Sequence, residues 1–170
     1  MKRFLPLILI VFLIAVVSCE KKKPAKIMGK LPAFSLEDPL GKMHTSKEVV
    51  KNGLVLVVTA PTLHNSGAQN NWSTFLLETM PNHNLTLVFL EDMDPSSFKG
   101  TALKEMKKEF KENEPPLLLI DNTGNLRKKL GVEKNETWVL VYNKDAELLF
   151  TEKSKPTKAL AQTIWGKLKK

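Results

Sequence analysis

The sequence predicts an α/β fold, a three-layer sandwich built around a mixed central sheet. Three apolar runs, at residues 54–60, 85–90 and 116–120, are typical of strands buried in a parallel sheet. Helical patterns separate these runs, as crossover connections require, and a hairpin pattern follows the third run. The 170 residues, 42% hydrophobic and 26% charged, suit one globular domain, which we assign to residues 31–170.

A hairpin and a short helix are predicted at the start of this domain. Residues 33–36 and 43–45 are short extended segments joined through the turn at 39–41. Thr45-Ser46-Lys47-Glu48 is a capping-box pattern that predicts the start of a helix, and Asn52-Gly53 predicts its end.

Two longer helices are predicted between the parallel strands. The first ends before Pro81, and its apolar face consists of Trp72, Phe75, Leu76, Leu77 and Met80. The second begins with Asp94 as N-cap and Pro95 in the first helical position. Its apolar face consists of Phe98, Ala102, Leu103, Met106 and Phe110.

The predicted C-terminal part is a hairpin followed by a helix. Residues 137–142 and 148–151 flank a turn at 143–146. The last helix is amphipathic, with Ala161, Ile164, Trp165 and Leu168 on its apolar face.

The first eighteen residues have the organisation of an export signal. Lys2 and Arg3 precede an apolar run at 4–17, which is followed by Ser18. As a helix this run would reach about 21 Å, short of a hydrocarbon core of about 30 Å. We therefore expect residues 1–18 to be a signal peptide rather than a membrane-spanning helix.

Val16-Val17-Ser18-Cys19 resembles the bacterial lipobox, whose cysteine becomes the lipidated first residue of the mature chain. The resemblance implies that Cys19 carries acyl chains such as palmitate and anchors the protein on the non-cytoplasmic side of the bacterial cell envelope. Glu20 stands where the inner-membrane retention signal has Asp, which favours the outer membrane. The alternative is an ordinary secretory signal in which Cys19 is incidental.

Most of the positive charge lies before the domain. Residues 19–30 hold five Lys and one Glu, a net +4 of the formal +8, whereas residues 31–170 hold 19 basic and 17 acidic side chains. We expect residues 19–30 to form a solvated basic tether, with contact to anionic lipid head groups as the alternative. Since the charge is not gathered on the domain, no nucleic-acid partner is expected.

Four segments of the domain follow one family's pattern in the right order: residues 29–36, 38–42, 116–132 and 137–143. They resemble the peroxiredoxin (alkyl hydroperoxide reductase / thiol-specific antioxidant) branch of thioredoxin-like proteins. The resemblance implies a thioredoxin-like three-layer sandwich with an N-terminal β-hairpin extension of peroxiredoxin type. The chain departs from the pattern at Asn143, in the place of an Asp, and at Ala146, in the place of a Gly.

The reactive motif of that family, P-x-x-x-T-x-x-C, is not preserved. Pro61 is retained, but Asn65 takes the place of the Thr and Ala68 that of the cysteine, while the family's later Arg falls on Asn135. The resemblance thus implies a vestigial active-site loop formed by Pro61, Thr62, His64, Asn65, Ala68 and Asn135. No cysteine follows Cys19, which excludes peroxidase and disulfide-exchange chemistry by this chain alone.

Other reactive groups are sparse. His64 and Ser66 could form a nucleophile pair, but we favour a solvated His64 and a helix-capping Ser66. His44, His64 and His83 are too scattered to form a metal centre. Glu91-Asp92-Met93-Asp94 could hold a cation, but we expect helix capping by Asp94 and solvation of the other carboxylates. No metal or other cofactor is expected.

Three functions are compatible with these residues. We favour a membrane-anchored, non-catalytic domain that acts as an interaction or binding module for an envelope protein. The second is an accessory component of an envelope thiol-redox or peroxide-defence system that works with a separate cysteine-bearing enzyme. The third is an enzyme of unrecognised type at His64, Asn65 and Ser66.

Overall fold

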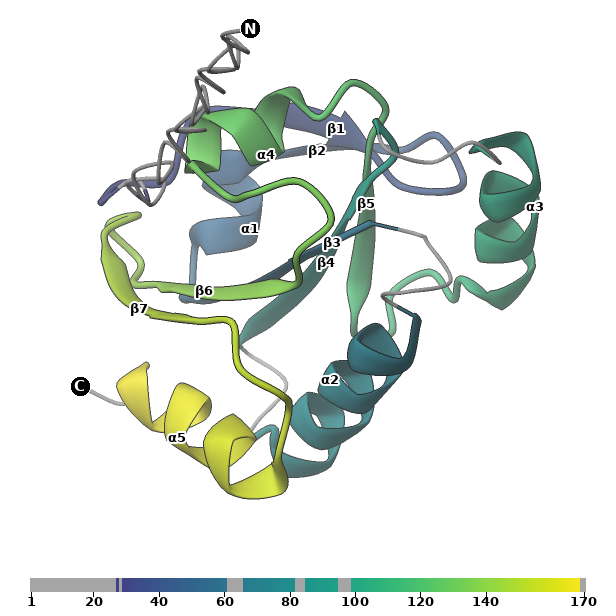
Figure 1. The fold of residues 1–170 in the computed structure, drawn as a ribbon. Helices are drawn as coiled ribbons and strands as arrows, with labels where there is room; N and C mark the ends of the chain where they lie inside the picture. Colours follow the sequence, from purple (N-terminus) through teal and green to yellow (C-terminus); the bar gives the residue numbers. More distant parts are fainter. Residues whose placement is uncertain (1–26, 28, 61–65, 82–84, 95–98, 169–170) are drawn as a thin grey trace, which may run out of the picture.

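A computed structural model of the chain describes residues 27, 29–60, 66–81, 85–94 and 99–168 (Figure 1). The predicted signal peptide, Cys19 and most of the predicted tether lie outside these residues. None of the described helices is both long enough and apolar enough to cross a membrane.

The described residues form one mixed sheet with helices on both faces. The strands are β1 Ser35–Glu37, β2 Met43–Thr45, β3 Leu54–Thr59, β4 Thr86–Asp92, β5 Leu117–Asp121, β6 Trp138–Tyr142 and β7 Leu148–Glu152. The helices are α1 Ser46–Val50, α2 Ser66–Thr79, α3 Lys99–Glu109, α4 Asn125–Leu130 and α5 Lys158–Lys167. The predicted α/β sandwich with a mixed sheet and an N-terminal hairpin is confirmed.

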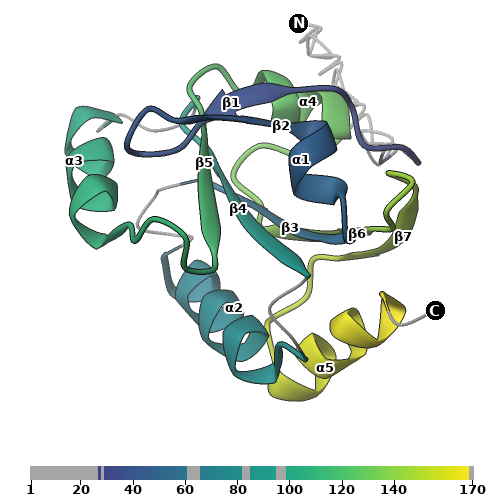
Figure 2. The same cartoon turned by 180° about the vertical axis from the view of Figure 1, so that it is seen from behind.

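The strand order is β2-β1-β5-β4-β3-β6-β7. The three central strands β3, β4 and β5 are parallel, whereas β6 pairs antiparallel with β3, and the hairpins β1–β2 and β6–β7 complete the two sides. Helices α2 and α5 lie on one face of the sheet, and α1 and α4 lie on the other, while α3 lies beside β5 (Figures 1 and 2).

Side-chain alternation along the buried strands divides the core in two. In β3, Leu54, Leu56 and Val58 belong to the core under α1 and α4. Val55 and Val57 belong to the core under α2 and α5. Because both faces of β3 are covered, its sequence is apolar throughout, which is the signal that predicted a buried strand.

Local signals position several element ends as predicted. Thr45 accepts a hydrogen bond from the Glu48 N–H at 3.4 Å, and the Glu48 carboxylate accepts one from the Thr45 N–H at 2.7 Å, so the capping box is confirmed. The predicted N-terminal segment of the second long helix, residues 95–98, lies outside the described residues, and α3 is described from Lys99.

The structure contains one helix that the sequence analysis did not predict. The Asp121 carboxylate accepts hydrogen bonds from the backbone N–H groups of residues 125–127 at 2.7–3.3 Å, which organises the first turn of α4. The apolar face of α4 consists only of Leu126 and Leu130, four residues apart. With fewer than two turns, the helix gives no clear periodicity in the sequence.

The chain enters the domain along the β6–β7 hairpin. Leu31 N–H donates to the Ala146 carbonyl at 2.8 Å, and Leu148 N–H donates to the Gly29 carbonyl at 2.9 Å. Lys30 forms a bridge with Glu147. The two residues before the domain, Gly29 and Lys30, are therefore paired with the β6–β7 hairpin through their backbone, although both are exposed to solvent.

Candidate functional site

The structure brings two residues of the predicted vestigial site to one surface cavity. Ala68 lies in the first turn of α2, and Asn135 lies in the loop before β6, yet both line a cavity of about 300 Å³. The other lining residues are Trp72, Glu136, Thr137, Lys153, Ser154, Lys155 and Pro156. We call this set the α2–β6 cavity. Pro61, Thr62, His64 and Asn65 lie outside the described residues.

Sheet topology explains why these distant residues meet. Strand β3 runs toward α2, and β6 lies antiparallel beside it, so the loop before β6 lies at the same edge as the end of β3. The hydroxyl groups of Thr59 and Thr137 lie 3.4 Å apart across these two strand ends. The α2–β6 cavity therefore lies at the carboxyl edge of the central strands, a common location for ligand sites in such sheets.

Asn135 suits the backbone of its loop. Its φ is +64°, in the left-handed region that Asn adopts more readily than most residues with side chains. An Arg at this position, as the family pattern has, would carry a larger conformational strain in the same backbone. The local geometry thus suits Asn better than the Arg that the resemblance would place at this position.

The charged residues that line the α2–β6 cavity are Glu136, Lys153 and Lys155. The Lys153 ammonium lies 3.7 Å from a Glu136 carboxylate oxygen and 5.3 Å from the centre of the Trp138 ring. Glu136 also accepts a hydrogen bond from the Trp138 indole N–H at 2.8 Å. Lys155 has no ion-pair partner among the described residues, so it is available to a ligand in solvent.

The lining of the α2–β6 cavity can bind a ligand, but it contains no thiol. The methyl group of Ala68 cannot attack a peroxide or a disulfide. The alternative nucleophile pair of His64 and Ser66 lies outside the side chains that the structure describes. The chemistry that the described lining supports is recognition of a polar or acidic group by Lys153 and Lys155.

The acidic cluster at residues 91–94 differs from the expectation. We expected helix capping and solvation, but Glu91 is 0% exposed and Asp92 is 1% exposed. The physical reason is that β4 continues past its apolar run, so Glu91 pairs with Ile120 and Asp92 with Asp121 along β5. Solvation is therefore wrong for both carboxylates. Among the described residues, no group of three or more His, Cys, Asp or Glu could hold a metal ion.

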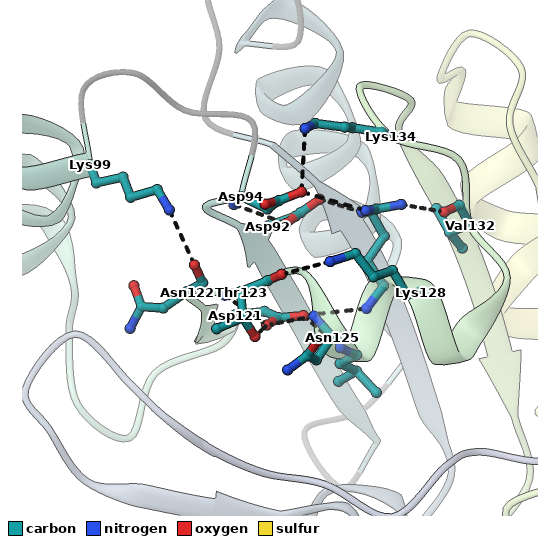
Figure 3. A network of polar contacts seen from close by, with 12 residues as sticks. Asp92, Asp94, Lys99, Asp121, Asn122, Thr123, Asn125, Lys128, Val132 and Lys134 are labelled. Carbon is teal, nitrogen blue, oxygen red and sulfur yellow. Dashed lines mark hydrogen bonds and ion pairs between the residues drawn. The ribbon is translucent and has the colours of Figure 1, made fainter.

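Asp92 belongs to a buried network on the α4 side of the sheet (Figure 3). Its carboxylate lies 2.5 Å from the Arg127 guanidinium, which also donates to the Val132 carbonyl at 3.0 Å. Asp94 lies 3.3 Å from the Lys134 ammonium and 3.7 Å from Arg127. Burial raises the pKa of Asp92, although the Asp94 N–H and Arg127 oppose the rise. Arg127 is thus a structural residue that the sequence analysis missed.

Glu91 points to the opposite face, toward α2. One of its carboxyl oxygens accepts a hydrogen bond from the Gln69 side-chain amide, and the other has no hydrogen-bond partner in the described structure. Burial raises the pKa of Glu91 to about 8, against the opposing effect of the Gln69 hydrogen bond. Sequence analysis missed the pairing with Gln69 because it joins α2 to β4, which only the folded chain brings together.

The ring of His44 has a hydrogen-bond partner, which is typical of a histidine with a structural role. Its Nε2 lies 3.1 Å from an Asp38 carboxylate oxygen, and Asp38 also accepts hydrogen bonds from the N–H groups of Leu40 and Lys42. Burial favours a higher pKa for Asp38, but His44 and these N–H groups outweigh it and lower the pKa.

No protein-family model and no curated protein matches the sequence, whereas many solved structures match the fold. A Chlorobium tepidum protein named provisionally as the thiol:disulfide interchange protein DsbE is 15% identical, with a TM-score of 0.64 over 84% of this chain and 98% of its own. The exposed lipoprotein thioredoxin Etrx1 of Streptococcus pneumoniae is 16% identical, with a TM-score of 0.61 over 78% and 98%. Peroxidoxin BcpB of Mycobacterium tuberculosis is 16% identical, with a TM-score of 0.56 over 85% and 96%. The chain therefore has a thioredoxin-like fold, as its resemblance to the peroxiredoxin branch implied.

Proposed function

We propose that this chain is a membrane-anchored, non-catalytic thioredoxin-like domain that binds a protein partner in the bacterial cell envelope through the α2–β6 cavity. The observation that carries the proposal is the cavity itself. It lies at the place that the resemblance assigns to the reactive thiol, it is lined by Ala68 instead of a cysteine, and it presents Lys153 and Lys155.

The lining residues indicate the chemistry of the partner. Lys155 lacks an ion-pair partner among the described residues. The Lys153 ammonium lies 3.7 Å from the Glu136 carboxylate, a long distance for an ion pair. An extended segment with an acidic side chain would complement both ammonium groups, while the partly exposed Pro156 offers apolar surface beside them. Cys19, on the lipobox resemblance, would hold the domain at the membrane.

Site-specific photo-crosslinking in native membranes tests the docking surface. A photoreactive amino acid in place of Ser154, an exposed lining residue, keeps Lys153 and Lys155 and is compared with one at Lys129, an exposed position on α4 at the opposite face. We expect one dominant adduct from position 154, lost when Ala68→Trp fills the cavity. The same adducts from both positions, or insensitivity to Ala68→Trp, would contradict the proposal.

Mass spectrometry of the mature N-terminus tests the anchor separately. Protein isolated from native membranes should begin at Cys19 with acyl chains attached, and Cys19→Ala should release the domain from the membrane fraction. An unmodified Cys19 thiol in membrane-derived protein would refute lipid anchoring without bearing on the docking surface.

A second candidate is an accessory role beside a cysteine-bearing redox enzyme. It is favoured by structural neighbours whose names include a thiol:disulfide interchange protein and a peroxidoxin. The two candidates differ in the identity of the adduct from position 154. A partner that carries a reactive cysteine pair favours the accessory role, and a partner without one favours the plain binding module.

A further inference from the structure

A second cavity lies on the other side of α2, above the buried carboxyl group of Glu91. It has a volume of about 420 Å³, and its lining residues come from α2, the end of α3 with the segment that follows it, and strands β4 and β5. Its apolar walls are Leu77, Met106, Phe110 and Leu118, and Gln69 and Glu91 lie at one end. This size is typical of small-molecule sites.

Glu91 is the unusual feature of this cavity. Its side chain is fully buried, and one carboxyl oxygen has no hydrogen-bond partner in the described structure, although the other is bound by Gln69. Buried polar atoms almost always have partners, so an unpartnered oxygen beside an apolar cavity marks a place for a ligand donor. Packing does not explain the carboxyl group, since Leu87 and Phe89 occupy the same face of β4 with apolar side chains.

The charged residues around the cavity favour a cation. Lys111 and Glu114 form an ion pair at 3.3 Å, which leaves Glu109 without a cationic partner among the described residues. The side chains around the cavity therefore carry a net negative charge even while the carboxyl group of Glu91 is protonated. An anionic ligand would meet repulsion here, whereas an ammonium group would be attracted.

We propose that this cavity binds a small amphiphilic amine, whose ammonium N–H donates to the free oxygen of Glu91 and whose apolar body packs against Leu77, Phe110 and Leu118. The inference does not depend on the docking role of the α2–β6 cavity, since the two cavities share no lining residue.

Binding should release a proton. Burial raises the pKa of Glu91 to about 8, so the group is mainly a neutral acid at pH 7. The groups that face it are the neutral Gln69 from α2, Glu109 from α3, and the Lys111–Glu114 pair that follows α3. When an ammonium group binds, the acid gives its proton to solvent and remains as the paired carboxylate. About 0.9 proton should be released per ligand at pH 7, and affinity should rise roughly fifty-fold from pH 6 to pH 8.

Calorimetric titration of the full chain in neutral micelles tests the proposal, with 2-phenylethylamine as probe and empty micelles as blank. Its neutral and anionic counterparts are 2-phenylethanol and 3-phenylpropionate. We expect saturable binding of the amine alone, and buffers of different ionisation enthalpy should report the released proton. Glu91→Gln should weaken the amine at least tenfold and abolish proton release, while Glu133→Gln, an exposed substitution outside the cavity lining, should change affinity less than threefold.

A cavity-filling variant provides a second test that remains valid if Glu91→Gln does not fold. Leu118→Trp keeps the carboxyl group but occupies the cavity, and it should abolish binding while far-ultraviolet circular dichroism and cooperative urea unfolding stay native. The proposal is overturned if the amine does not bind at millimolar concentration, if 2-phenylethanol binds equally, if no proton is released, or if Glu91→Gln binds as the wild type does.

Discussion

Replacing Glu91 with Gln should stabilise the domain, and the gain should grow with pH. The carboxyl group is fully buried, its ordinary pKa is 4.5, and burial raises the pKa to about 8 in the folded chain. Since the folded state holds this proton more tightly than the unfolded state, stability from Glu91 is present below pH 4.5 and is lost as the pH rises through 8.

The size of the effect follows from the two pKa values. Each unit of difference is worth about 1.4 kcal/mol, so the contribution of Glu91 to the free energy of unfolding falls by roughly 3–4 kcal/mol between pH 5 and pH 8. Gln has nearly the same shape and does not titrate. The advantage of Glu91→Gln over the wild type in free energy of unfolding should thus be roughly 3–4 kcal/mol larger at pH 8 than at pH 5.

Urea unfolding at pH 5, 6, 7 and 8 measures this difference, followed by fluorescence of the buried Trp72 and Trp165. Asp92, whose pKa is also raised, is present in both proteins and cancels in the comparison. Glu109→Gln, an exposed substitution, is the matched control and should leave the pH dependence unchanged. A constant difference between wild type and Glu91→Gln across this range would refute the reasoning.

Three further predictions concern the buried network, the hairpin turn and the vestigial site. Arg127→Ala leaves the Asp92 charge buried without its partner and should lower the free energy of unfolding at pH 7 by about 3–5 kcal/mol, with partial recovery when Asp92→Asn is added. Urea titration measures both variants, and an unchanged unfolding midpoint for Arg127→Ala would contradict this prediction. Ala146→Gly relieves a residue at φ +63° and should raise the free energy of unfolding by up to about 1 kcal/mol, whereas a loss in the same assay would show that packing of the methyl group dominates. Ala68→Cys places a thiol at the first turn of α2 beside two Lys, and both should lower the pKa of that thiol. Iodoacetamide should therefore react with it several-fold faster at pH 7 than with the thiol of Gln162→Cys in the middle of α5. Equal rates would contradict this electrostatic effect.

The sequence predicted the architecture well because its strongest signals are local. The apolar run of β3 and the capping box at Thr45 and Glu48 each identify an element from neighbouring residues alone. The end of β4 was missed because a buried strand is recognised by apolar side chains, and Glu91 and Asp92 are acidic. Their burial depends on Gln69 and Arg127, partners that are distant in sequence.

The candidate site could be predicted only in part. Its residues were identified from the resemblance, and the structure shows that Ala68 and Asn135 line one cavity. Lys153 and Lys155 were not predicted, since they follow β7 and reach the cavity only through the antiparallel pairing of β6 and β7. The cavity above Glu91 has no counterpart in any sequence pattern, because its walls come from two helices and a strand.

The affinity of the crosslinked partner for the purified full chain tests the central claim most directly. Lys153→Glu with Lys155→Glu reverses the charge of the α2–β6 cavity, and Lys47→Glu with Lys51→Glu makes the same change in net charge at the exposed end of α1. The account predicts at least a tenfold loss of affinity for the first pair and less than a twofold change for the second. Equal losses for the two pairs, or full affinity after charge reversal at the cavity, would contradict a role of this cavity in partner binding.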